Sequence, residues 1–208
     1  MNVNFKIRPM TKIDLKKEDP NYYKAKLKAE LREFEPYQYI SIKGVGAPES
    51  VHFQESIPAI YAAAYAIKKQ SQTLGRDFVV PKMEGQWWVK EGADFESTPR
   101  DDWHWKILIR LPEFVTKEMA LHAFDYIAET KQLNQSKALQ FETIHEGLCI
   151  QIMHIGSYDE EQESIAKIIA FMNEKQMSFN GYHHEIYLSD PRKTPVEKLK
   201  TILRYPIR

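Results

Sequence analysis

The chain has little of the chemistry that would cross-link it or anchor it in a membrane. Cys149 is its single cysteine, so no intrachain disulfide and no cysteine zinc cluster can form, as is usual in a reducing cytosol. The longest apolar run, Pro58 to Ile67, is ten residues, about half of what a bilayer span needs. The first residues also lack the apolar stretch of a secretory signal. We therefore expect a cytoplasmic protein without a membrane partner.

Several charge patterns and cofactor motifs are missing as well. Lys+Arg and Asp+Glu each number 29, so the basic excess of a general nucleic-acid binder is absent. The segment Gly44-Val45-Gly46 lacks the third glycine of a dinucleotide fingerprint, and the chain contains no P-loop lysine motif and no Gly-x-Ser-x-Gly elbow. Histidines at metal-binding spacing are absent too. We expect no cofactor, no metal and no nucleic-acid partner.

Internal repetition is the most informative positive feature of the 208 residues. The tetrapeptide Gln-Glu-Ser-Ile at 54–57 recurs at 162–165, and an apolar run ending in glycine precedes each copy. Downstream, residues 106–112 match residues 200–206. Three matches in the same order indicate a duplicated domain with a pseudo-twofold axis.

Hydrophobic periodicity gives both copies the same order of elements, β-α-β-β. The expected strands are 38–45 and 147–155, and the expected helices are 53–72 and 159–175. The expected hairpins pair 77–89 with 103–111 and 181–189 with 200–207, and a linker helix is expected at 116–131. The fold class is therefore α+β, built from tandem duplicated βαββ units.

We divide the chain into an N-terminal arm at 1–36 and one domain at 37–208. The domain consists of repeat one at about 37–112, a linker helix region at about 113–137 and repeat two at about 138–208. A helix would cover one sheet face of each unit. The opposite faces would then pack toward each other and leave a ligand cleft between the repeats.

Residues 181–190 carry the sharpest chemical signal. Side chains alternate faces along a strand, so His183, Glu185 and Tyr187 share one face. Ile186 and Leu188 share the other, which we expect beneath the helix. The first face would look into the cleft, where Glu185 binds a cation or moves a proton and Tyr187 acts beside it. The alternative is a solvated strand edge for Glu185, with Tyr187 only packing.

Aligning Lys69-Gln70 with Lys175-Gln176 places Val79 opposite Glu185 and Pro81 opposite Tyr187. Repeat one would then offer apolar surface where repeat two offers a carboxylate and a phenol. Burial would raise the pKa of that carboxyl, while a donated hydrogen bond would lower it.

Aromatic side chains gather on the first hairpin. Trp103 and Trp105 share one strand face, whereas Trp87 and Trp88 point to opposite faces. Rings from both strands would form walls for a flat or cationic ligand, and plain core packing is the alternative for each of them. The candidate ligand-binding residues are Trp88, Trp103, Trp105, His183 and Tyr205.

The duplicated plan, together with residues 84–88, 141–147 and 183–192, resembles the GyrI-like small-molecule-binding proteins, and most closely their stand-alone bacterial branch. The resemblance spans essentially the whole chain. It implies a tandem α+β fold with a cleft between the repeats, in which the central acid maps onto Glu185 and the ring walls map onto Tyr187 and some tryptophans. No helix-turn-helix segment precedes the domain, so we do not expect a complete regulator.

The resemblance implies three functions. Stand-alone members hydrolyse the activated cyclopropane of DNA-alkylating natural products, which implies a detoxifying hydrolase with Glu185 as the base and Tyr187 beside it. Effector domains of multidrug-responsive regulators bind lipophilic cations, which implies a sequestering or effector-binding module. The founding member inhibits gyrase, which implies a protein partner, but the balanced charge gives this third function no support.

Overall fold

The computed structural model describes residues 12–208, so residues 1–11 of the expected arm lie outside the described part. The strands are β1 Lys12–Ile13, β2 Glu30–Phe34, β3 Tyr37–Val45, β4 Asp77–Phe78, β5 Glu84–Trp88, β6 His104–Leu111, β7 Gln140–Ile144, β8 Gly147–Ile155, β9 His183–Tyr187 and β10 Lys200–Pro206. The helices are α1 Leu15–Glu18, α2 Val51–Thr73, α3 Lys117–Thr130 and α4 Gln162–Glu174. The predicted β-α-β-β order is confirmed in both copies.

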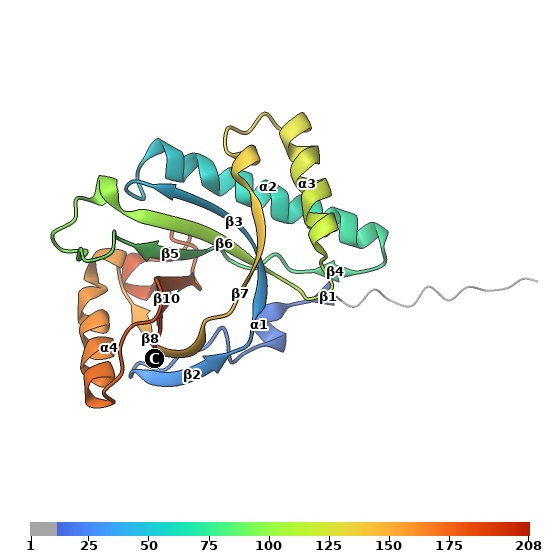
Figure 1. The fold of residues 1–208 in the computed structure, drawn as a ribbon. Helices are drawn as coiled ribbons and strands as arrows, with labels where there is room; N and C mark the ends of the chain where they lie inside the picture. Colours follow the sequence, from blue (N-terminus) through green and yellow to red (C-terminus); the bar gives the residue numbers. More distant parts are fainter. Residues whose placement is uncertain (1–11) are drawn as a thin grey trace, which may run out of the picture.

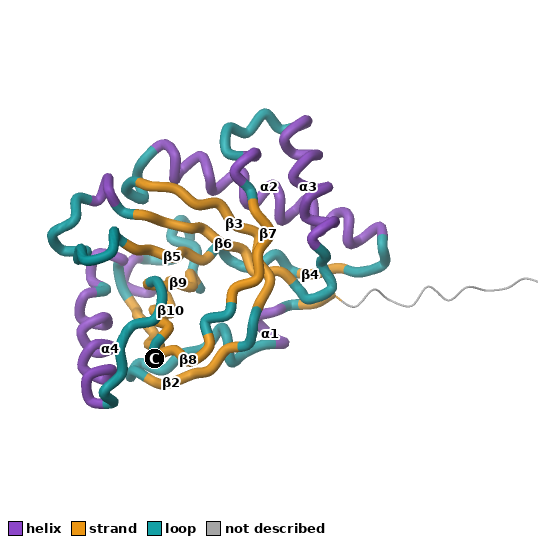
Figure 2. The backbone as a smooth tube through the Cα atoms, viewed as in Figure 1, coloured by secondary structure: helices purple, strands orange, loops and turns teal. Residues whose placement is uncertain are grey.

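Eight strands form one curled antiparallel sheet in the order β2-β8-β10-β9-β5-β6-β3-β7 (Figure 1). Its curl follows from two short connections. Only Glu35 and Pro36 join the edge strand β2 to β3, which lies next to the opposite edge, and only His145 and Glu146 join the other edge strand, β7, to β8. Such short links require the two edges to approach each other, and the tube in Figure 2 shows this bend.

The two βαββ units are related by a pseudo-twofold axis between β9 and β5. On one side the order is β9-β10-β8, and on the other it is β5-β6-β3. The units therefore join edge to edge through the ladder of β5 and β9, and the predicted packing of two sheet faces against each other is wrong. Each unit also receives at its outer edge the short strand that precedes the other unit, β2 on β8 and β7 on β3.

The three long helices, α2, α3 and α4, lie on one face of the sheet, which we call the outer face. Helix α2 begins at the N-cap Ser50 and packs on β3 and β6, with α3 beside it, and α4 covers β8 (Figure 1). The predicted apolar stripes are buried in large part, since Ile60, Ala64 and Ile67 are inaccessible, although Ile169 of α4 is exposed. The N-cap Thr116 starts α3 as expected.

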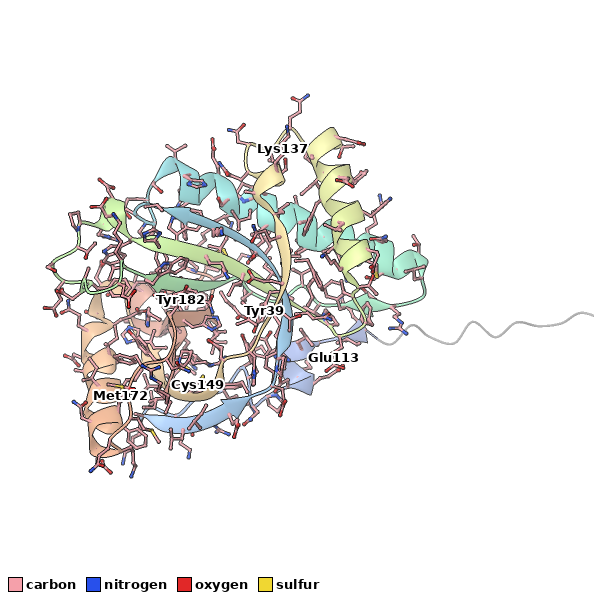
Figure 3. All side chains as sticks on the ribbon, viewed as in Figure 1. Tyr39, Glu113, Lys137, Cys149, Met172 and Tyr182 are labelled. Atoms are coloured by element: carbon pink, nitrogen blue, oxygen red, sulfur yellow. The ribbon has the colours of Figure 1, made fainter. Side chains whose placement is uncertain are left out.

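The opposite, inner face is covered by residues 12–34, a segment of the expected arm that contributes Tyr22, β2 and Phe34. Ile186 packs against this segment, so the expectation that Ile186 lies beneath the helix is wrong. Tyr39 and Cys149, labelled in Figure 3, also point inward and are buried. Because both sheet faces are covered, the apolar side chains of β9 do not identify the helix side.

A network of buried charges crosses the inner face between the two repeats. His184 donates to Glu84 at 3.1 Å and to Glu146 at 2.9 Å, and Arg204 donates to Glu146 at 3.1 Å. Burial opposes the charge on His184, but Glu146 and Glu84 raise the pKa of its imidazole to about 9. The hydroxyl of Tyr22 completes the network by donating to Glu84 at 2.5 Å. This network fastens the N-terminal segment to both repeats.

The expected strand at 77–89 is divided. Asp77–Phe78 forms β4, which pairs in parallel with β1, and the sheet strand β5 begins only at Glu84. Pro81 lies between them, where a residue without an N–H is compatible with a break in pairing. Between residues 12 and 208 the structure contains no helix that combines the length and the hydropathy needed to cross a membrane.

Candidate functional site

The centre of the site lies where the two repeats meet on the outer face. Glu185 of β9 pairs directly with Gly85 of β5. Gly85 pairs with Ile107, which pairs with Ile42. Glu185 pairs with Leu203, which pairs with Ile152. Ile42 and Ile152 each stand four residues before the glycine that ends the matched apolar runs, so Gly85 and Glu185 are equivalent positions beside the axis. The predicted match of residues 106–112 with 200–206 is therefore two residues out of register. The predicted alignment of Val79 with Glu185 is therefore wrong, because the connection from α2 to β5 contains the extra strand β4.

This equivalence makes the site asymmetric. One repeat supplies the carboxylate and the other supplies no side chain at all. A Cβ on Gly85 would lie 2.7 Å from the Tyr187 hydroxyl and 2.9 Å from Trp87 Nε1, so the glycine makes room for both rings. Trp87 and Tyr187 are themselves equivalent, since Trp87 pairs with Trp105 and Tyr187 pairs with Thr201.

The first repeat contributes an aromatic wall. Trp87 stacks on Phe53 at 5.4 Å between ring centroids, and Trp105 meets Phe53 edge-on at 5.0 Å. Trp103 lies edge-on to Trp87 at 6.3 Å and is partly exposed, whereas Trp105 is fully buried behind the others. Phe53 lies in the first turn of α2, so the start of this helix closes the wall over β5.

The second repeat contributes phenols. Tyr187 accepts a hydrogen bond from Trp87 Nε1 at 3.4 Å and meets the partly exposed Tyr158 edge-on at 5.7 Å. Tyr205 packs against the His183 ring at 4.7 Å. Burial and then the charge of Glu185 raise the pKa of Tyr187 well above its usual value, so its hydroxyl keeps its proton at neutral pH.

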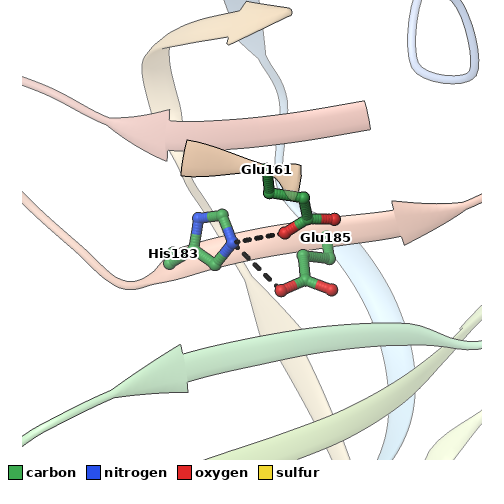
Figure 4. Close-up of side chains that lie close together, drawn as sticks. All are labelled: Glu161, His183 and Glu185. Atoms are coloured by element: carbon green, nitrogen blue, oxygen red, sulfur yellow. Dashed lines mark hydrogen bonds and ion pairs between the residues drawn. The ribbon is translucent and has the colours of Figure 1, made fainter. Parts of the chain in front are cut away.

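Glu161, His183 and Glu185 form a compact cluster (Figure 4). His183 Nε2 lies 3.0 Å from Glu185 Oε1 and 3.9 Å from Glu161 Oε2. All three side chains are largely buried, with Glu185 at 12% exposure. One ligand atom from each lies within 4.8 Å of the other two, and His183 itself bridges the two carboxyls in the place that a metal ion would take.

The electrostatics of the cluster are set by burial and like charge. Burial, then Glu185 and then Asp159 raise the pKa of the Glu161 carboxyl to about 10. Within residues 12–208, neither Glu161 nor Glu185 forms an ion pair with a lysine or an arginine. No lysine or arginine of the described residues lies against these two carboxyls, so the cluster can accommodate a further positive charge.

The family model described as "GyrI-like small molecule binding domain" matches residues 28–208. The chain belongs to this GyrI-like family. Among solved structures, an uncharacterized conserved protein from Listeria innocua is 35% identical, with a TM-score of 0.87. A hydrolase encoded by lin2189 of the same organism is 34% identical, with a TM-score of 0.85. In both comparisons the alignment covers 95% of this chain and 100% of the other.

A solved structure of much lower sequence identity shares the fold. The EcmrR C-terminal domain is 12% identical, with a TM-score of 0.61, and the alignment covers 87% of this chain and 97% of that one. The curated proteins contain no match to the chain. The α+β fold and membership of the GyrI-like family are thus confirmed.

In this GyrI-like chain, six of the seven residues named from the sequence share the outer face. They are Glu185, Tyr187, Trp103, Trp105, His183 and Tyr205. Trp88 points to the inner face, where it stacks on Tyr182 at 4.3 Å and on His104 at 5.6 Å. The structure does not bring it to Glu185.

Two residues of the site escaped the sequence reasoning in this role. The sequence analysis names Trp87 only as a ring of the first hairpin, and Glu161 is not among its candidate residues. The repeat itself held a usable signal, because Phe53 directly precedes the first Gln-Glu-Ser-Ile and Glu161 directly precedes the second. The helix starts of the two repeats therefore present a ring and a carboxyl to equivalent places.

A separate hollow of about 460 Å³ lies beside α4, and its lining includes His154, Glu160 and Ser164 but not Glu185. His154 Nδ1 accepts from Ser164 at 3.1 Å, and Nε2 donates to the Ser157 carbonyl at 2.9 Å. The repeat explains this pair. The pair of Gly44 and Trp105 in the first repeat corresponds to the pair of His154 and Thr201 in the second. The large side chain lies on β6 in the first repeat and on β8 in the second, so a packing role accounts for His154.

Proposed function

We propose that the strip of outer face between the starts of α2 and α4 binds a flat aromatic or lipophilic cationic small molecule. The observation that supports this most is the position of Glu185, a largely buried acid opposite a glycine, with tryptophan and phenylalanine rings on one side and tyrosines on the other. Rings over a cation contribute about 0.5–2 kcal/mol each, and the carboxylate adds charge complementarity. A cytoplasmic location is consistent with the single cysteine.

We further propose that the bound molecule is an activated cyclopropane of a DNA-alkylating toxin and that the protein hydrolyses it for self-protection. Glu185 takes a proton from water as the water oxygen bonds to the ring carbon. The strained carbon–carbon bond breaks, and its electron pair moves into the conjugated carbonyl, which takes up a proton. Tyr187, protonated at neutral pH, is placed to donate toward developing negative charge. The 34% identical hydrolase supports a hydrolytic reaction.

The test compares turnover of a cyclopropane-bearing alkylator by the wild type and by Glu185→Gln. General-base assistance contributes about 10²–10⁴-fold, so the variant should lose a factor in this range while retaining the fold. Glu163→Gln is the matched control, because Glu163 is an exposed acid in the first turn of α4. Unchanged turnover by Glu185→Gln would show that Glu185 is not the base.

The second candidate is a module that sequesters the same molecules unchanged. Two carboxyls that share His183 without any lysine or arginine are suited to holding a cation, and holding requires no reaction. Mass spectrometry of the ligand after incubation separates the candidates. Addition of one water indicates the hydrolase, whereas complete recovery of intact ligand with measurable affinity indicates the binder.

A further inference from the structure

Glu161 occupies an unusual place for an acid at the start of a helix. It is the N-cap residue of α4, yet its side chain makes no capping hydrogen bond. The preceding turn, Tyr158–Glu160, is capped by Ser157 and Glu160 through a reciprocal pair of side-chain bonds. Glu161 is therefore free of the role that commonly places acids at this position, and its carboxyl faces His183 and Glu185 (Figure 4).

The hydrogen-bonding capacity of the Glu161 carboxyl is also only partly satisfied. It is 6% exposed, and its Oε1 has no hydrogen-bond partner within residues 12–208. Its counterpart in the first repeat, Phe53, stacks on Trp87 and needs no partner. A buried oxygen left unpaired costs free energy, which indicates that the position serves a ligand or a proton rather than stability alone.

The groups that face Glu161 include two further carboxyls, and both oppose its ionisation. Glu185 and His183 face it from β9, Tyr205 from β10, and Asp159 and Tyr158 from its own turn. Tyr187, also on β9, interacts electrostatically with Glu161 as well. Two carboxyls this close in a largely buried place do not both ionise without a compensating charge, so one keeps a proton.

We propose that Glu161 is the second carboxyl of the ligand site and that a cationic ligand entering the site displaces the proton that Glu161 holds. This inference depends on the proposed function, because it concerns the same site. The exchange is balanced: the carboxyl becomes a carboxylate, the proton passes to solvent, and the ligand's positive charge takes its place beside both carboxylates. A neutral ligand of the same shape leaves the proton where it is.

The experiment is isothermal titration calorimetry of the full chain between pH 6 and 8.5, in buffers of different ionisation enthalpy. The probes are 10-methylacridinium, a planar fixed cation, and 9-anthracenemethanol, its neutral counterpart. For the wild type we expect release of about one proton per cation bound, and an affinity that rises by up to about tenfold per pH unit. The neutral probe should release none.

Glu161→Gln should bind the cation without proton release and with a flat pH profile, whereas the matched control Glu163→Gln should behave as the wild type. If Glu161 had only a structural role, its substitution would change the affinity for the cation equally at every pH and would leave proton release intact in any variant that folds. Cation binding without proton release, or equal release by Glu161→Gln, would overturn this inference alone. Failure of both probes to bind the folded wild type would overturn the proposed function with it.

Discussion

Gly85 is the position where a single methyl group tests the geometry of the site most directly. In Gly85→Ala the new Cβ would meet the Tyr187 hydroxyl at 2.7 Å and Trp87 Nε1 at 2.9 Å, both well inside normal contact. Overpacking of this kind costs about 1–3 kcal/mol. Alanine regains about 0.5–1 kcal/mol over glycine inside a strand. We therefore expect a net loss of about 0–2.5 kcal/mol in the free energy of unfolding.

A domain of this size loses about 2–4 °C in Tm for each kcal/mol, so Gly85→Ala should unfold up to about 10 °C lower in a thermal scan. The cause can be tested by a double-mutant cycle with Tyr187→Phe. Removing the hydroxyl deletes the 2.7 Å contact and leaves the ring carbon Cζ at 3.4 Å, an ordinary distance. The double variant should therefore be more stable than the sum of the single changes by about 0.5–1.5 kcal/mol.

Tyr205→Phe is the matched control for this cycle. Tyr205 lies on the same sheet face, but its hydroxyl is not among the nearest neighbours of the added Cβ. Its combination with Gly85→Ala should be additive within about 0.5 kcal/mol. Additivity of the Tyr187→Phe cycle, or equal coupling in both cycles, would refute the placement of Tyr187 over Gly85.

Three further predictions concern the buried acids and the tryptophans. His184→Gln removes the charged imidazole that bridges Glu84 and Glu146, and it should cost about 3–5 kcal/mol in urea unfolding; a loss below about 1 kcal/mol would contradict the inner-face network. The free energy of unfolding should fall as pH rises from about 5 toward 10, because folded Glu161 keeps a proton that the unfolded chain releases near its ordinary pKa. Glu161→Gln should flatten this fall. Parallel curves of unfolding free energy against pH for the wild type and the variant would exclude the raised pKa. Trp87→Leu should weaken binding of a planar cation about 2–30-fold, whereas Trp88→Leu on the inner face should leave it within about twofold; fluorescence titration would show the reverse order if the faces are misassigned.

The sequence predicted the elements closely because each is encoded locally. The apolar spacing of α2, the N-cap of α3 and the alternation of β3 and β8 all depend on residues within a few positions of one another. The repeat also follows from sequence alone. The exceptions among the elements are the divided strand at 77–89 and the edge strands β2 and β7, which were not predicted, because the pairings of β4, β2 and β7 are contacts between distant segments.

Face assignments were harder to predict. Ile186 was expected under a helix, but it packs against Tyr22 of the N-terminal segment, which shows no clear hydrophobic period. Because that segment covers the inner face, both faces of β9 are buried and the alternation identifies two faces without saying which one the helix covers. Glu185 and Tyr187 were still placed together, since a shared strand face does not depend on that choice.

The amino-acid sequence by itself determined the duplicated βαββ plan, the pairing of an acid with a phenol on one strand face and the concentration of tryptophans in one hairpin. Only the tertiary structure decided that Glu185 faces Gly85, that Trp88 turns away and that Glu161 joins the site from the start of α4. These relations join residues far apart in the chain. They depend on the register between β5 and β9 and on how the helices pack, and non-local contacts set both.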